Sequence, residues 1–118
     1  YNASFDKGFL FAELERSAVV LVDPPPALRK EVTWIDPLVF ARELYKGQGE
    51  SRALRAVAER LGVPLINAHR ATDDAEATLR VLYAMAPDNR IPRTYAAFLQ
   101  EQRRLERSQL EATRFWRK

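Results

Sequence analysis

The chain has 118 residues, the size of one domain or a large part of one. Hydrophobic residues make up 47% and charged residues 30%, as in a globular protein. With no cysteine, the sequence excludes a disulfide scaffold, a thiol nucleophile and a cysteine-ligated zinc site. No apolar run approaches the roughly 20 residues that span a bilayer, so we expect a cytoplasmic protein with no membrane partner.

The net charge of +3 is unevenly distributed along the chain. Residues 93–118 carry seven Lys and Arg residues against three Glu, whereas the remainder carries twelve against thirteen acidic residues. The basic excess therefore lies in this C-terminal segment, which includes Arg103, Arg104 and Arg107. A basic strip can contact phosphate, although a solvated helix face is the commoner explanation. We accordingly separate residues 1–92 from a basic C-terminal helix, residues 93–118.

The first predicted helix covers residues 4–17, with Ser4 as its N-cap. Its apolar side chains fall on two sides, which predicts a helix sandwiched in the interior. Three consecutive prolines, residues 24–26, then predict a loop because proline fits neither a helix interior nor a central strand. The β-favouring run at residues 31–35 predicts a short strand.

The next predicted helix opens with Asp36 as N-cap and Pro37 in the first turn, and it runs to about Tyr45. Ser51 is the expected N-cap of a third helix, which Gly62 ends. The apolar stripe of that helix has helical spacing and consists of Leu54, Val57, Ala58 and Leu61.

A fourth helix is predicted to begin at Thr72 or Asp73 and to end before Pro87. One face of it is apolar and consists of Ala75, Leu79, Leu82 and Ala86. The last helix, residues 94–116, is long and polar, and its apolar positions are too irregular for a coiled coil. A single strand cannot stand alone among five helices. We therefore expect partner strands upstream of Tyr1 or on another chain.

Three titratable side chains sit at or just before a predicted helix start: Asp6, His69 and Asp74. An acidic residue in a first helical turn is favoured by about 0.3–1 kcal/mol without any function, and a single His is usually structural. Asp36 and Asp73 are better explained as helix caps than as metal ligands. Spacing alone therefore leaves a structural role open for all three.

Two stretches resemble motifs of the DEDDh 3′–5′ exonucleases, the family that includes the proofreading epsilon subunit of bacterial DNA polymerase III. Residues 1–10, Tyr-Asn-Ala-Ser-Phe-Asp-Lys-Gly-Phe-Leu, resemble the second exonuclease motif. Residues 68–78 resemble the third motif, in which four residues separate His69 from Asp74. Tyr1 departs from the commoner His, at a position that does not bind metal in the family. The resemblance covers residues 1–86.

The resemblance implies an α/β fold of the ribonuclease H-like class, with a mixed sheet flanked by helices. Residues 1–92 would form the C-terminal part of the exonuclease domain, rich in helix and lacking the first strands. We expect an apolar face to lie against the absent sheet. Its predicted members are Phe5, Phe9, Leu54, Leu61, Leu79 and Leu82.

The implied chemistry is phosphodiester hydrolysis at a nucleic-acid 3′ end by two divalent ions, Mg²⁺ or Mn²⁺. Asp6 and Asp74 would ligate metal, and His69 would be the general base. Single-stranded DNA is favoured over RNA as substrate, with a DNA polymerase subunit as a partner. The first family motif, an Asp and a Glu separated by one residue, belongs upstream of Tyr1. The isolated chain is therefore expected to have little or no nuclease activity.

Two alternatives stay open at this point. The first is a nucleic-acid- or polymerase-binding module without catalysis, and the second is a helical structural domain whose motifs match by chance. An upstream strand carrying Asp-x-Glu would separate the enzyme from the binding module. The helical structural domain, in contrast, predicts that metal does not change the stability of the protein, even with the missing segment restored.

Overall fold

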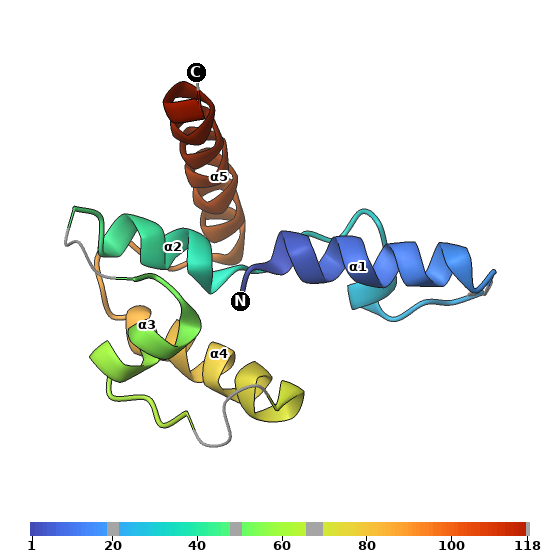
Figure 1. Cartoon of the computed structure of the whole chain (residues 1–118), viewed down its shortest axis with the longest axis horizontal. Helices are drawn as coiled ribbons and strands as arrows, with labels where there is room; N and C mark the ends of the chain where they lie inside the picture. The colour runs from blue at the N-terminus through green and yellow to red at the C-terminus, as the bar shows by residue number, and fades with distance from the viewer. Residues whose placement is uncertain (19–21, 48–50, 66–69, 118) are drawn as a thin grey trace.

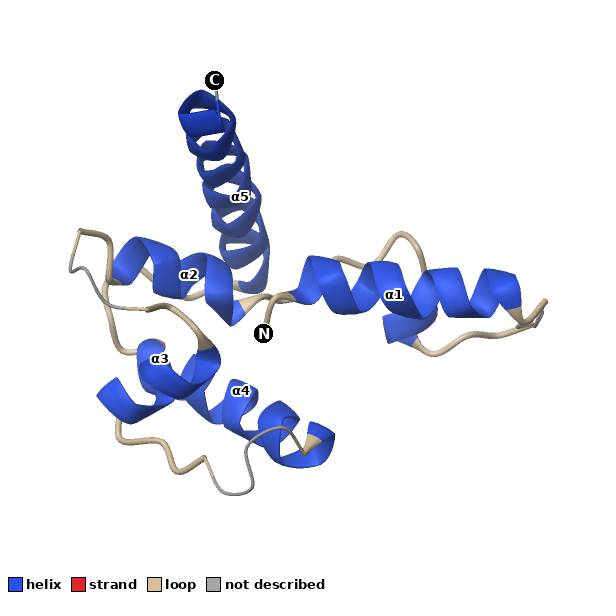
Figure 2. Ribbon diagram, in the orientation of Figure 1, coloured by secondary structure: helices blue, strands red, loops and turns tan. Residues whose placement is uncertain are grey.

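The computed structural model describes residues 1–18, 22–47, 51–65 and 70–117. They form five α-helices and one short 3-10 helix, and no strand occurs among these residues (Figure 2). None of the described helices combines the length and apolarity needed to cross a membrane. In chain order the elements are α1 (Ala3–Arg16), η1 (Pro26–Leu28), α2 (Pro37–Leu44), α3 (Leu54–Arg60), α4 (Ala71–Met85) and α5 (Tyr95–Arg117).

The core is built around α2, which packs against α4 and α5, while α3 packs against α4 (Figure 1). Phe40 of α2 is 1% exposed, and its ring centroid lies 4.6 Å from that of Phe98 on α5. The predicted α3 stripe is confirmed, since Val57 and Ala58 are buried and Leu54 and Leu61 pack against the core. The remaining buried members come from α2, α4, α5 and the α4–α5 loop: Val39, Ala41, Leu44, Val81, Met85, Ile91 and Leu105.

Helix α1 extends away from this core (Figure 1), and the prediction that it is sandwiched in the interior is wrong. Its one buried residue is Ala3, whereas Phe5 and Phe9 are 68% and 64% exposed. Ser4 lies inside the helix and is not its N-cap. The N-cap position belongs to Asn2, whose backbone is left-handed and whose side chain makes no capping bond.

The strand predicted at residues 31–35 does not form, and the segment is a turn followed by irregular chain. Side chains from two helices satisfy part of its backbone instead of a partner strand. Lys7 of α1 donates to the Val32 carbonyl at 2.8 Å, and Gln102 of α5 donates to the Trp34 carbonyl at 2.8 Å. The β-favouring side chains had no strand to pair with among the described residues.

Two predicted helix starts were also displaced. Helix α3 begins at Leu54, and Ser51 accepts a 3.1 Å bond from the Ala53 amide in the preceding turn rather than capping the helix. Helix α4 begins at Ala71, so Thr72 and Asp73 lie within its first turn and neither is the N-cap. In contrast, Asp36 caps α2 as predicted.

Helix α4 buries a different face from the one predicted. The buried residues are Ala77, Val81 and Met85, whereas Leu79 is 50% exposed. The helix has two apolar faces, and the periodicity identified the outer one. Of the six residues expected against an absent sheet, Phe5, Phe9 and Leu79 are exposed, but Leu54 and Leu61 pack against the core and Leu82 is half-buried.

Candidate metal centre

Asp6 and Asp74 line the same pocket, although 67 residues separate them in the chain. Asp6 lies in the first turn of α1, and Asp74 lies in the first turn of α4. Two of the three predicted site residues thus border one pocket. The pocket is completed by the half-buried Tyr1 and by Leu54, Ala71, Ala75 and Thr78.

Both carboxylates are available for a ligand. No hydrogen bond or ion pair engages either of them within the part of the chain that the structure describes. Thr78 donates to the backbone carbonyl of Asp74 at 2.7 Å and leaves its side chain alone. Each acid lies in the first turn of its own helix, where the partial positive charge of the helix N-terminus favours a carboxylate.

The N-terminus of α1 is held by a residue from elsewhere in the chain. Asp36 is 5% exposed, and its carboxylate accepts from the Asn2 amide and the Ala3 amide, both at 2.9 Å. The same carboxylate accepts from the Leu38 amide at 3.1 Å as the N-cap of α2. One buried acid therefore binds the N-termini of two helices, α2 and α1, and Asp6 lies on α1.

Tyr1 makes a further attachment beside this cap. Its hydroxyl donates to the Arg52 carbonyl, which ties the start of the chain to the segment before α3. Burial, with the nearby charge of Asp36, raises the pKa of the Tyr1 phenol above its ordinary value. The phenol therefore stays a neutral hydrogen-bond donor at physiological pH.

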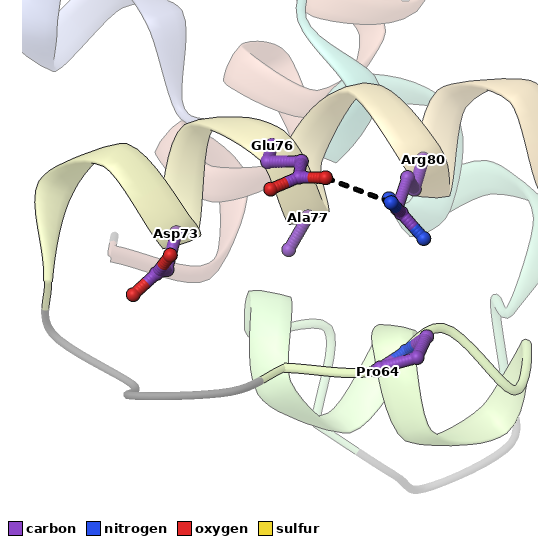
Figure 3. A pocket seen from close by; sticks show the side chains of 5 residues that line it. All are labelled: Pro64, Asp73, Glu76, Ala77 and Arg80. Carbon is purple, nitrogen blue, oxygen red and sulfur yellow. Dashed lines mark hydrogen bonds and ion pairs between the residues drawn. The ribbon is translucent and has the colours of Figure 1, made fainter.

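Asp73 lies next to Asp74 in the chain but faces a different pocket (Figure 3), which it shares with Pro64, Glu76, Ala77 and Arg80. Glu76 pairs with Arg80 at 2.7 Å along α4 (Figure 3). One carboxylate oxygen of Asp73 is buried without a hydrogen-bond partner among the described residues. The helical turn thus separates the two acids, and only Asp74 joins Asp6.

The donor set suits Mg²⁺ or Mn²⁺ in kind, because these hard cations prefer oxygen ligands. It is too small in number, since no group of three or more His, Cys, Asp or Glu residues that could hold a metal occurs in the described ranges. His69 lies outside the described residues. Two carboxylates fit part of a divalent-metal site, and further ligands are needed to complete it.

The three arginines proposed for nucleic-acid contact differ in their surroundings. Arg103 donates to the Thr33 hydroxyl at 3.0 Å, and Arg104 forms a two-nitrogen contact with Glu101 on the same helix. That contact lowers the pKa of Glu101 and raises the pKa of Arg104. Arg107 is exposed and is the one of the three with no recorded partner in the described part of the chain.

Sequence reasoning missed Gln102, the most deeply buried polar side chain described, at 1% exposure. Its carboxamide oxygen accepts from the Asp36 amide at 2.8 Å while its nitrogen donates to the Trp34 carbonyl. The signal was present in the spacing of the inner face of α5, which consists of Phe98, Gln102, Leu105 and Gln109. Two glutamines in this stripe made the apolar pattern look irregular.

Comparisons with known proteins agree with the motif assignment. The family model described as exonuclease, RNase T, matches residues 1–82. DNA polymerase III PolC-type of Streptococcus suis (strain 98HAH33) is 36% identical over 88 residues, covering 75% of this chain and 5% of that protein. The same-named protein of Streptococcus pneumoniae serotype 4 (strain ATCC BAA-334 / TIGR4) is 39% identical over 83 residues, covering 70% of this chain and 5% of that protein.

The match to these relatives is confined to a small part of them. The chain spans about 5% of the length of the curated relatives it matches. No solved structure matches the chain.

Proposed function

Because the chain belongs to the RNase T exonuclease family, we propose that it forms the half of a 3′–5′ exonuclease domain that carries the second and third metal-binding motifs. The observation that carries this proposal is the shared pocket of Asp6 and Asp74. Two acids from distant motifs border one pocket, and neither forms an ion pair with another described residue. A mixed ribonuclease H-like sheet would complete the domain and cover the exposed face of Phe5, Phe9 and Leu79.

The proposed chemistry is hydrolysis of the terminal phosphodiester bond. Asp6 and Asp74 would hold divalent ions, which would supply an activated water and neutralise charge at the phosphate. His69 would be the general base of the reaction, since an imidazole titrates near neutral pH. An Asp-x-Glu motif upstream of Tyr1 would supply the remaining carboxylates, and we expect little or no activity from residues 1–118 without it.

We propose the 3′ end of single-stranded DNA as the substrate and a cytoplasmic DNA polymerase as the partner. The support is that the relatives carry the name DNA polymerase III. Arg107 and Arg103 would contact the phosphate backbone without reading sequence. Arg104 is a weaker candidate because Glu101 already engages its guanidinium.

The test is a nuclease assay on 3′-labelled single-stranded DNA with Mg²⁺ or Mn²⁺, using protein extended to include the segment encoded before Tyr1. We expect metal-dependent shortening from the 3′ end that Asp6→Asn and Asp74→Asn each abolish. Asp23→Asn is the matched control, because this carboxylate is exposed and distant in sequence from both motifs. Activity that survives Asp74→Asn would overturn the proposal.

A module that binds DNA or a polymerase without catalysis is the second candidate. It is favoured by one observation, the lack of a third metal ligand among the described residues. An upstream segment without Asp-x-Glu, together with retained DNA binding, would select it.

A further inference from the structure

We infer that Gln102 of α5 is a positioning residue for the metal centre, acting through Asp36 on the N-terminus of α1 and so on Asp6. This inference rests on the proposed function. Gln102 lies outside residues 1–82, the range that the exonuclease family model matches. The C-terminal helix would thereby contribute to the site without touching it.

The first step of this relay joins α5 to the segment before α2. The Gln102 carboxamide accepts from the Asp36 amide and donates to the Trp34 carbonyl, with both distances at 2.8 Å. It also donates to Glu106 at 3.3 Å. A buried amide side chain bonded on both sides fixes the backbone on which Asp36 sits, because any shift leaves a buried polar group unsatisfied.

The second step joins Asp36 to α1. The two carboxylate oxygens of Asp36 divide their bonds between the start of α1 and the start of α2. Helix α1 has no cap of its own, and Ala3 is its only buried residue. Its remaining attachments in the described chain are the Tyr1 hydroxyl and the Lys7 ammonium. Asp36 therefore provides the charged anchor of a helix that has little packing to hold it.

The third step joins the anchor to the metal ligand. Asp6 lies one helical turn beyond Ala3, whose amide Asp36 binds. A displacement of the helix start is passed directly to the Asp6 carboxylate, whereas Asp74 on α4 stays in place. Because metal sites need ligands held within fractions of an ångström, such a shift lowers metal affinity.

Gln109 provides a matched control on the same helix. Its side-chain nitrogen donates to the Val39 carbonyl at 2.9 Å, so it too ties α5 to α2, but it makes no hydrogen bond to Asp36. Gln102→Met and Gln109→Met each remove one glutamine bonded to backbone and preserve side-chain volume. A general loosening of α5 affects both variants, whereas loss of the relay affects only the first.

The experiment uses protein extended to include the segment encoded before Tyr1, labelled with ¹⁵N, so that the ligands expected to complete the metal site are present. Exchange protection of the Ala3 amide reports the Asp36 bond, and titration with Mn²⁺ broadens amide signals near a bound ion. We expect Gln102→Met to reduce Ala3 protection and to raise the Mn²⁺ midpoint at Asp6 by about tenfold, the lower end for outer contacts of a metal site. Asp36→Asn should act in the same direction, and Gln109→Met should change neither readout.

Unchanged Ala3 protection in Gln102→Met, or equal Mn²⁺ midpoints in the two glutamine variants, would overturn the relay. Failure of the proposed function has a different signature, namely that Mn²⁺ does not broaden Asp6 and Asp74 even in the parent chain. In that case residual dipolar couplings, which report the orientation of α1, test the relay from Gln102 to Asp6. A reorientation of α1 in Gln102→Met but not in Gln109→Met supports the relay, and an unchanged orientation in Gln102→Met refutes it.

Discussion

Replacing Asp36 by Ala tests how strongly one buried acid organises this fold. The substitution removes three bonds from backbone amides to a carboxylate that is 5% exposed. Loss of an N-cap costs about 0.5–2 kcal/mol, and two helices lose theirs. Removing the Asp36 charge also recovers part of the free energy that burying this charge costs. The total loss is therefore smaller than the sum of the upper limits for the two N-caps. We therefore expect a loss of about 3 kcal/mol in the free energy of unfolding.

For a chain of this length, a loss of that size lowers the melting temperature by roughly 12 °C. Urea and thermal unfolding followed by circular dichroism at the helix band measure both quantities. The control is Asp23→Ala, which removes a 92% exposed side chain in a surface pair with Arg29 and should cost less than about 1 kcal/mol. Equal losses in the two variants would refute the reasoning that Asp36 is a shared cap.

Three further outcomes follow from the contacts. Burial, together with the charge of Asp36, raises the pKa of Glu106, so the ionised form opposes folding. Glu106→Gln should therefore raise the urea midpoint of unfolding near pH 7. Below the ordinary glutamate pKa of about 4.3 the substitution should have no effect, and a change that does not depend on pH would contradict this. Phe40→Ala should cost about 3–5 kcal/mol in unfolding experiments, because the ring is 1% exposed and packs on Phe98. In the extended protein, Arg107→Gln should reduce by about 1 the slope of the logarithm of single-strand affinity against the logarithm of salt concentration. Arg104→Gln should change this slope less, because Arg104 is paired with Glu101. Slopes equal to that of the parent would argue for a solvated helix face.

The sequence predicted what depends on neighbours in the chain. Asp36 followed by Pro37 is a local signal for the start of a helix, and the start of α2 confirms this prediction. Leu54, Val57, Ala58 and Leu61 predicted the inner face of α3 because that helix has a single apolar stripe. That Asp6 and Asp74 would lie at one site was expected from two motifs of one family rather than from spacing, and both acids line one pocket.

The long-range contacts could not be read in this way. Nothing near Asn2 indicates that its helix is capped by Asp36, because the bond spans 34 residues. Helix α4 carries apolar residues on two faces, and packing against α2 and α3 selects Val81 over Leu79 as the buried residue. The segment 31–35 has β-favouring side chains, but a strand forms only where its backbone pairs with another strand. At the Trp34 carbonyl, the hydrogen bond comes instead from the side chain of Gln102.

The most direct test of a shared metal centre is a Mn²⁺ titration of the protein extended to include the segment encoded before Tyr1, comparing the parent with Asp74→Asn. If the two acids form one metal centre, amide signals around Asp6 and Asp74 broaden with a common midpoint, and Asp74→Asn weakens the effect at both. Broadening around Asp6 that is indifferent to Asp74→Asn would contradict the account, because the acids would then bind ions independently.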